Sequence, residues 1–124
     1  MRLSTVLLIA LVLAGCGRKA PDTVSFKGQI QPILNARCVS CHGPEKAEGK
    51  IVLVSYDAVM NSRILPGKKP LVIPSNQAQS WLYILCATDQ PHYRMPPDTS
   101  SRSLVPREEL LLIANWIKQG AQNN

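Results

Sequence analysis

Residues 38–42 read CVSCH, two cysteines three positions apart with a histidine directly after the second. Two thiols and an imidazole at this spacing serve three different chemistries: a zinc site, a redox-active disulfide, or the covalent attachment of a haem. Each chemistry requires different partners elsewhere in the chain. This short motif therefore constrains the fold more than any other segment, and the rest of the sequence has to decide between the three.

The first fifteen residues have the pattern of a secretory signal peptide, with Arg2 followed by an apolar run over residues 6–14. Nine apolar residues are too few to span a bilayer, which takes roughly 20. The segment LAGC at 13–16 resembles a bacterial lipobox, which implies cleavage before Cys16 and lipidation of its sulfur. Gly17 then implies a periplasm-facing lipoprotein of the outer membrane in a bacterial cell envelope. The alternatives are an ordinary signal peptide with a free Cys16, or a buried N-terminal helix.

The net charge limits which partners are expected, and the cysteine count limits how many disulfides can form. The formal net charge is +6, and the basic residues are scattered rather than gathered into the dense stripe that nucleic acid requires. We therefore expect no nucleic acid, but protein partners with acidic or mixed surfaces. With Cys16 lipidated, three of the four cysteines remain, and an odd number cannot all form disulfides.

A helix is expected over residues 25–38, leading directly into the motif. Its apolar side chains recur at helical spacing and form one face: Phe26, Ile30, Ile33 and Leu34. Ser25 is suited to cap its start. Pro32 either kinks the helix or marks a regular part that starts near Gln31.

Further helices are expected over residues 55–61, 77–87 and 106–119. Ser55 can cap the first of these, and Ser75 or Asn76 the second; Gly120 ends the third. Leu110, Ile113, Ala114 and Ile117 form the apolar face of the last helix, widened by Leu112 and Trp116. Residues 51–54 are a short strand or simply extended, and three prolines make residues 66–76 a wrapped loop rather than a strand.

The sequence thus predicts an all-α domain over residues 24–121, in which three or four helices are joined by long loops. Residues 16–23 form a lipidated tether after the signal peptide, and residues 122–124 a C-terminal tail. Long loops are unusual in a compact domain unless they have something to pack against, and the apolar core is thin at this length. A buried prosthetic group resolves both difficulties.

The three chemistries of CVSCH do not fit the chain equally. Zinc needs four ligands, and beyond the motif the only mature cysteine and histidine are Cys86 and His92, with no second Cys-x-x-Cys pair. A thioredoxin-like motif starts a helix after a strand, whereas this one follows a helix. In the haem interpretation Cys38 and Cys41 form thioethers with the vinyl groups, and His42 binds the iron.

A second axial ligand is then required, and Met95 in RMPP is the favoured candidate, because two prolines stiffen the loop that presents its sulfur. His92 is an alternative that gives a bis-histidine iron, and Met95 could also be a surface residue without a role. Met60 has the spacing of a core residue. Cys86 has the spacing of a small buried apolar residue, with thiolate ligation or intermolecular pairing as rarer outcomes.

Four segments together resemble the planctomycete-type cytochrome c domain, a branch of the class I cytochromes c. They are FKGQIQPILNARCVSCHG, VIPSNQAQSWLY, MPP and REELLLIANWIKQGA, spread over residues 26–121. The resemblance implies a small class I cytochrome c fold around one covalent haem c. It implies N- and C-terminal helices that cross beside the haem, with His42 as the proximal and Met95 as the distal ligand. Val105, PSN at 74–76 and Cys86 depart from the family pattern.

These observations predict a membrane-anchored monohaem cytochrome c that carries single electrons and turns over no substrate of its own. The alternative is a haem-based sensor or an accessory subunit of a larger redox complex. A peroxidase is disfavoured because the sequence offers no evident distal acid–base pair.

Overall fold

The computed structural model describes residues 23–124, so the expected signal peptide and Cys16 lie outside the described residues. Along the chain, the elements are η1 (Phe26–Ile30, a π-helical turn), α1 (Gln31–Arg37), η2 (Glu48–Lys50, a 3₁₀ turn), α2 (Tyr56–Asn61), β1 (Arg63–Ile64), β2 (Lys69–Pro70), η3 (Gln77–Gln79, a 3₁₀ turn), α3 (Trp81–Ala87) and α4 (Arg107–Lys118). Within residues 23–124, the sheet consists of one antiparallel pair of two-residue strands. The expected all-α fold class is confirmed.

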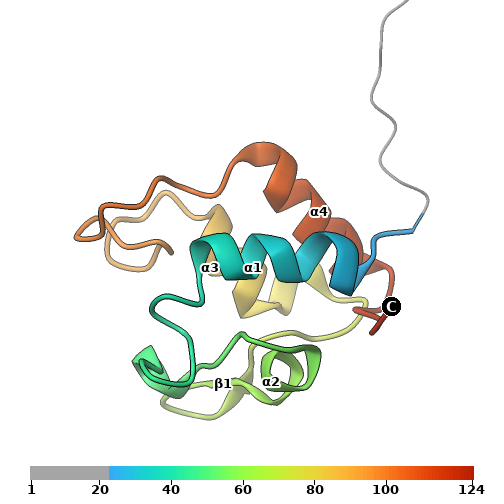
Figure 1. The fold of residues 1–124 in the computed structure, drawn as a ribbon, viewed down its shortest axis with the longest axis horizontal. Coiled ribbons are helices and arrows are strands. Elements are labelled where there is room, and N and C mark those ends of the chain that lie inside the picture. The colour runs from blue at the N-terminus through green and yellow to red at the C-terminus, as the bar shows by residue number, and fades with distance from the viewer. Residues whose placement is uncertain (1–22) are drawn as a thin grey trace, which may run out of the picture.

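The helices form one packed unit with long loops at its edges (Figure 1). α1 crosses the front of the molecule in Figure 1, and α4 packs against η1 and against α3. α2 and the small hairpin lie along the lower edge of the same view. Within the part of the chain that the structure describes, no helix has the length and apolar character needed to cross a membrane.

The helix that leads into CVSCH begins with the π-helical turn η1. The Ser25 hydroxyl oxygen accepts a hydrogen bond from the Gly28 N–H at 3.0 Å, which confirms the expected cap. Regular α-helix then begins at Gln31, so that Pro32 falls in the first turn of α1, where no intrahelical bond is required of its nitrogen. Of the two arrangements expected around Pro32, the structure has the one with a regular helix from Gln31.

Asn124 lies across the start of this helix. Its backbone carbonyl oxygen accepts hydrogen bonds from the Ser25 hydroxyl at 2.9 Å and the Lys27 N–H at 3.0 Å. Its side-chain oxygen accepts a third from the Phe26 N–H at 2.8 Å. These contacts satisfy donors that the first turn of a helix leaves without intrahelical partners. Residues 122–124 are therefore held against the N-terminal end of the domain.

An aromatic cluster joins the two ends of the described chain to α2. The Phe26 ring lies 5.2 Å from Tyr56 and 5.3 Å from Trp116, measured between ring centroids. The polar ends of the two larger rings are satisfied: the Tyr56 hydroxyl donates to the Ala121 carbonyl at 2.8 Å, and the Trp116 Nε1–H to the Gln122 carbonyl at 2.9 Å. Such pairs add stability beyond their buried area.

The apolar core extends from this cluster toward α3. Its buried members come from every helix and from the loops between them: Val24, Phe26, Ile30, Ile33, Leu34, Ile51, Leu53, Val59, Leu71, Val72, Leu82, Ile113, Trp116, Ile117 and Ala121. The expected face of the first helix is fully buried. In α4 the expected face is buried except for Leu110, which is half-buried.

Three expectations about elements need correction. The helix expected over residues 77–87 is two elements, a 3₁₀ turn capped by the Asn76 side chain and then α3, which begins at Trp81; Ala78 is exposed. The break occurs because the buried Ser80 hydroxyl bonds back to the Asn76 and Ile73 carbonyls. In addition, the loop over 66–76 contains β2, and α4 starts one residue later than expected, with Pro106 at the cap position.

Candidate functional site

The CVSCH segment continues the turn at the end of α1. The Cys38 N–H bonds to the Leu34 carbonyl at 2.8 Å, and the N–H groups of Cys41 and His42 bond to the Cys38 carbonyl at 3.1 and 2.8 Å. Residues three apart on such a turn lie on the same face. Both thiols therefore point toward the same region, with the imidazole directly after them.

These three side chains line a cleft of about 550 Å³. The long loop before α4 supplies much of its other wall through residues 95–97 and 99–102, and α3 contributes Cys86. A volume of this size falls in the roughly 300–1,000 Å³ typical of ligand and cofactor sites. A smaller apolar cavity of about 50 Å³ shares four lining residues with the cleft: Cys38, His42, Cys86 and Met95.

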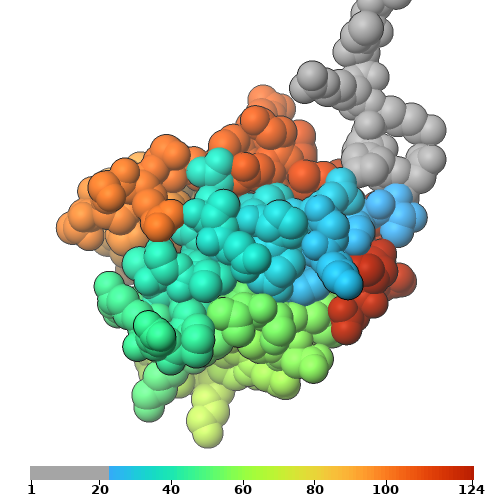
Figure 2. Space-filling view, in the orientation of Figure 1, coloured from blue at the N-terminus to red at the C-terminus, as the bar shows by residue number. Residues whose placement is uncertain are grey.

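The two loops that form this cleft lie at the same end of the molecule. Figure 1 shows residues 38–50 and residues 88–104 at the left of the helical unit, and Figure 2 shows that they meet at the surface there. The aromatic cluster and the two ends of the described chain lie toward the other end of α1. The fold therefore separates a well-packed end from an end built of loops.

The loop after the motif holds His42 in place. The Nδ1 atom of His42 lies 3.1 Å from the Glu48 carbonyl oxygen, which can only accept a hydrogen bond. The proton of a neutral imidazole is then fixed on Nδ1, and the lone pair on Nε2 is free to bind a metal. The His42 carbonyl in turn accepts a bond from the Leu53 N–H at 2.8 Å. Both the tautomer and the backbone position of His42 are thus set by its surroundings.

Gly43 is required by the close approach of this loop to the motif. A Cβ atom at position 43 would lie 2.6 Å from the Val39 carbonyl oxygen, closer than side-chain carbons are found in proteins. The Gly43 N–H meanwhile donates to the Lys46 carbonyl at 3.1 Å. Any larger residue would push apart the turn that carries the two cysteines and the loop that orients His42.

Met95 reaches the same site from the other loop. Its N–H donates to the Leu85 carbonyl at 2.8 Å, which fixes the backbone to the last turn of α3. Its half-buried side chain lines both cavities. His92, the alternative ligand, is exposed and lines neither cavity, and Met60 packs against the core on α2, as its spacing predicted. The structure therefore brings Met95, and not His92, to the cleft of His42.

Cys86 is buried in α3 and lines both cavities, consistent with its expected place as a small buried residue. Burial raises the pKa of its thiol to about 12, with a smaller contribution from Cys38. Burial also raises the pKa of Cys38 to about 11. Thiols with such pKa values stay protonated at neutral pH as long as no metal or haem is bound.

The zinc and thioredoxin-like interpretations find no support in the described residues. Over residues 23–124, no three histidine, cysteine or acidic side chains are grouped so that they could hold a metal ion. The same region contains no parallel sheet, only the hairpin of β1 and β2. The donors that converge include the two thiols of the motif, one imidazole and one thioether, which fits a covalently attached haem, and Cys86 adds a third, buried thiol to the same cleft.

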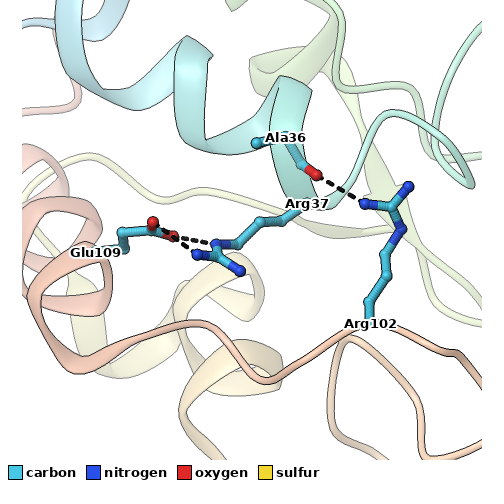
Figure 3. A network of polar contacts seen from close by, with 4 residues as sticks. All are labelled: Ala36, Arg37, Arg102 and Glu109. Carbon is cyan, nitrogen blue, oxygen red and sulfur yellow. Dashed lines mark hydrogen bonds and ion pairs between the residues drawn. The ribbon is translucent and has the colours of Figure 1, made fainter.

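Basic side chains gather at the rim of the cleft: Arg37, Lys46 and Arg102 all line it. Arg37 makes two hydrogen bonds to the Glu109 carboxylate of α4, of which the Nη2–Oε1 bond is 2.9 Å (Figure 3). The Nη1 group of Arg102 donates to the Ala36 carbonyl at 2.7 Å. The sequence did not point to any of these contacts.

The fold is small and helical, and its cleft is lined by Cys38, Cys41, His42 and Met95. This combination is typical of c-type cytochromes. The comparison with protein families agrees: the family described as Planctomycete cytochrome C matches residues 38–99, half of the chain, including the motif and Met95. The chain belongs to this family, as its sequence segments indicated. It is a haem-based redox protein, and its cofactor is covalently attached haem c.

Among solved structures, Kuenenia stuttgartiensis hydrazine synthase is similar at 30% sequence identity and a TM-score of 0.47. That alignment covers 82% of this chain and 17% of the other, so the chain spans about a sixth of the length of that protein. No curated protein gives a significant match.

Proposed function

We propose that this protein is a membrane-anchored monohaem cytochrome c that relays single electrons between redox partners in the bacterial cell envelope, with no substrate turnover of its own. The observation that carries this proposal is the shared cleft of Cys38, Cys41, His42 and Met95. Two attachment thiols and two different axial donors meet there from separate loops.

Each residue has a distinct role in this proposal. Cys38 and Cys41 hold the haem covalently as thioethers, and His42 binds the iron through Nε2, since its Nδ1 faces the Glu48 carbonyl. When bound, haem c supplies a one-electron Fe(III)/Fe(II) couple. The carbonyl contact would hold the imidazole in one orientation, with Nε2 available to the iron.

Met95 is the distal ligand in this proposal. A thioether raises the reduction potential relative to a second histidine and suits electron transfer. With both axial positions filled by the chain, a substrate has no free coordination position. That arrangement favours an electron carrier over an enzyme.

The sequence supports a lipid anchor on Cys16, which would place the domain at the periplasmic face of the outer membrane. Two or more acyl chains give stable anchoring, whereas one alone is marginal. A tether over residues 16–23 would reach about 25 Å when fully extended. The domain would then exchange electrons close to the membrane surface.

The charges at the rim indicate which partners fit. Arg37 and Lys46 beside the cleft are paired with Glu109 and Glu48, whereas Arg102 bonds to a neutral backbone carbonyl. The surface around the cleft therefore carries a small positive excess, which favours proteins with acidic or mixed surfaces. Complementary charges accelerate encounter and make it sensitive to salt, more than they add to affinity. Electron transfer to an acidic partner should therefore slow as ionic strength rises.

The experiment that tests the proposal compares Met95→Ala with Met60→Ala in the haem-loaded protein. The wild type should show a low-spin c-type spectrum with a weak far-red ferric band from sulfur ligation, and a haem stain that survives denaturation. Met95→Ala should lose the far-red band and bind carbon monoxide in the ferrous state. Met60→Ala should keep the band, because Met60 packs against the core on α2 and does not line the cleft.

A far-red band that survives in Met95→Ala would refute the assignment of the distal ligand. Carbon monoxide binding by the ferrous wild type at neutral pH would favour the alternative, a haem-based sensor. A denatured protein that retains no haem stain would refute the cytochrome assignment of the site.

A further inference from the structure

The loop that carries Met95 lacks regular secondary structure. Residues 88–105 contain no helix or strand, although they supply much of the wall of the cleft. At one end, the Met95 N–H is bonded to the Leu85 carbonyl in the last turn of α3. Within the loop, Arg94 forms an ion pair with Asp98 four residues later. Neither contact ties the loop to α1, which forms the facing side of the site.

Arg102 provides that connection. Its guanidinium donates a hydrogen bond of 2.7 Å to the Ala36 carbonyl, across a sequence separation of 66 residues (Figure 3). Ala36 lies in the last turn of α1, where carbonyl groups lack intrahelical donors and the helix dipole favours a positive charge. The contact is thus a helix cap supplied from the distal loop, two residues before Cys38.

The acceptor of this bond is itself held in place. Arg37, the next residue of α1, reaches in the other direction to the Glu109 carboxylate near the start of α4 (Figure 3). The loop reaches α4 five residues after Arg102, so that the two arginines connect α1, the loop and α4 in one ring of contacts. Release of Arg102 would remove this hydrogen bond between α1 and the stretch from Met95 to α4.

We propose that Arg102 is a positioning residue that holds the Met95 loop closed against the end of α1, and thereby sets how much of the time the Met95 thioether occupies its axial position. This inference rests on the proposed function, because it takes Met95 as the distal ligand. Arg102 does not contact the iron in this role and acts entirely through the loop.

The physical argument is a population shift between a closed and an open loop. An added ligand such as imidazole can bind the ferric iron only when the Met95 sulfur has moved away, so its apparent affinity is proportional to the open fraction. Loss of one exposed, charge-assisted hydrogen bond should increase the open fraction about fivefold, which corresponds to about 1 kcal/mol.

The test is an imidazole titration of the ferric, haem-loaded full-length protein, followed by loss of the far-red band. Arg102→Ala should bind imidazole about fivefold more tightly than the wild type. Arg102→Lys should fall between the two, because an ammonium can donate one bond to the Ala36 carbonyl but lacks the planar fork. Arg107→Ala is the matched control: it removes the same charge from an exposed position five residues along the chain.

Several outcomes would overturn the proposal. One is an Arg102→Ala affinity for imidazole that matches that of Arg107→Ala. Another is a fall in the urea midpoint of Arg102→Ala with no change in imidazole affinity, because that would show a structural role alone. If the wild type itself lacked the far-red band, the assignment of Met95 would fail instead, so the two failures are distinguishable.

Discussion

The Cys86 thiol shows how burial decides the chemistry of a single residue. It lies on the wall of the same cleft as Cys38 and Cys41, yet burial raises its pKa to about 12. A protonated thiol is a weak nucleophile and a poor metal ligand. Among the cysteines of the described chain, Cys86 lies outside the CVSCH motif, so it should be the free thiol that remains after haem attachment, acting as an apolar side chain.

We predict that iodoacetamide labels Cys86 of the folded, haem-loaded protein very slowly at pH 8. Raising the pKa from 9.0 to about 12 lowers the thiolate fraction, and so the rate, about a thousandfold relative to the unfolded chain. The rate should rise about tenfold per pH unit toward pH 12, as long as the protein stays folded. Mass spectrometry with and without urea measures both rates, and Cys86→Ala gives the background. Rapid labelling without urea would show that Cys86 is accessible and ionised.

The residues of the site divide into those that the sequence could predict and those that it could not. Cys38, Cys41 and His42 form a local motif, and Met95 stands out by its prolines; the structure brings all four to one cleft, while their roles stay predictions. The rim contacts join residues 66 and 72 positions apart. An arginine before a cysteine gives no local sign of a partner that far away, because only the fold brings the two together.

At the level of elements, the N-terminal helix is stabilised from outside its own sequence. Ser25 caps it locally, but two further donors of the first turn are satisfied by Asn124. The sequence predicted the helix and its cap from spacing and residue type, and treated residues 122–124 as a tail. Helical spacing also failed to predict the break at Ser80. The Ser80 hydroxyl is bonded to Ile73, a loop residue outside the helix, and local periodicity does not reveal such a partner.

We predict that Asn124→Ala destabilises the haem-loaded protein by about 1 kcal/mol, the usual effect of removing a helix cap. The substitution removes the side-chain bonds to the Phe26 N–H and to the Val24 carbonyl but leaves the backbone carbonyl in place. Asn123→Ala is the matched control, because Asn123 is exposed and next to it in the chain. Urea unfolding followed by circular dichroism measures the difference, and equal midpoints for the two variants would contradict the role of Asn124. The far-red band should be the same in both, since the cleft lies at the other end of α1.

At the scale of the whole molecule, the fold has two ends of different character. One is closed by the aromatic cluster and by Asn124, and the polar atoms of the Tyr56 and Trp116 rings are paired there. The other consists of residues 38–50 and 88–104 around a cleft of about 550 Å³. Loops of this length are stable only when they pack against something. The haem is therefore expected to supply packing at this end that the chain alone lacks.

We predict that a chain unable to attach haem, Cys38→Ala with Cys41→Ala, is less stable by at least about 3 kcal/mol. Each apolar side chain that loses its cover loses about 1.5–3 kcal/mol, and two half-buried side chains, Leu85 and Met95, line the smaller cavity at this site. For a domain of this size the melting temperature should fall by roughly 12 °C or more.

Hydrogen exchange should show where the stability is lost. Amides in residues 38–50 and 88–105 should exchange first, while those where α4 packs on η1 remain protected, because that contact does not involve the cleft. Cys86→Ala serves as the control, since it removes a thiol from the same wall but keeps both attachment residues. A haem-free chain with the melting temperature and exchange pattern of the loaded protein would contradict this prediction. It would show that the polypeptide alone packs the loops and that the haem does not stabilise the fold.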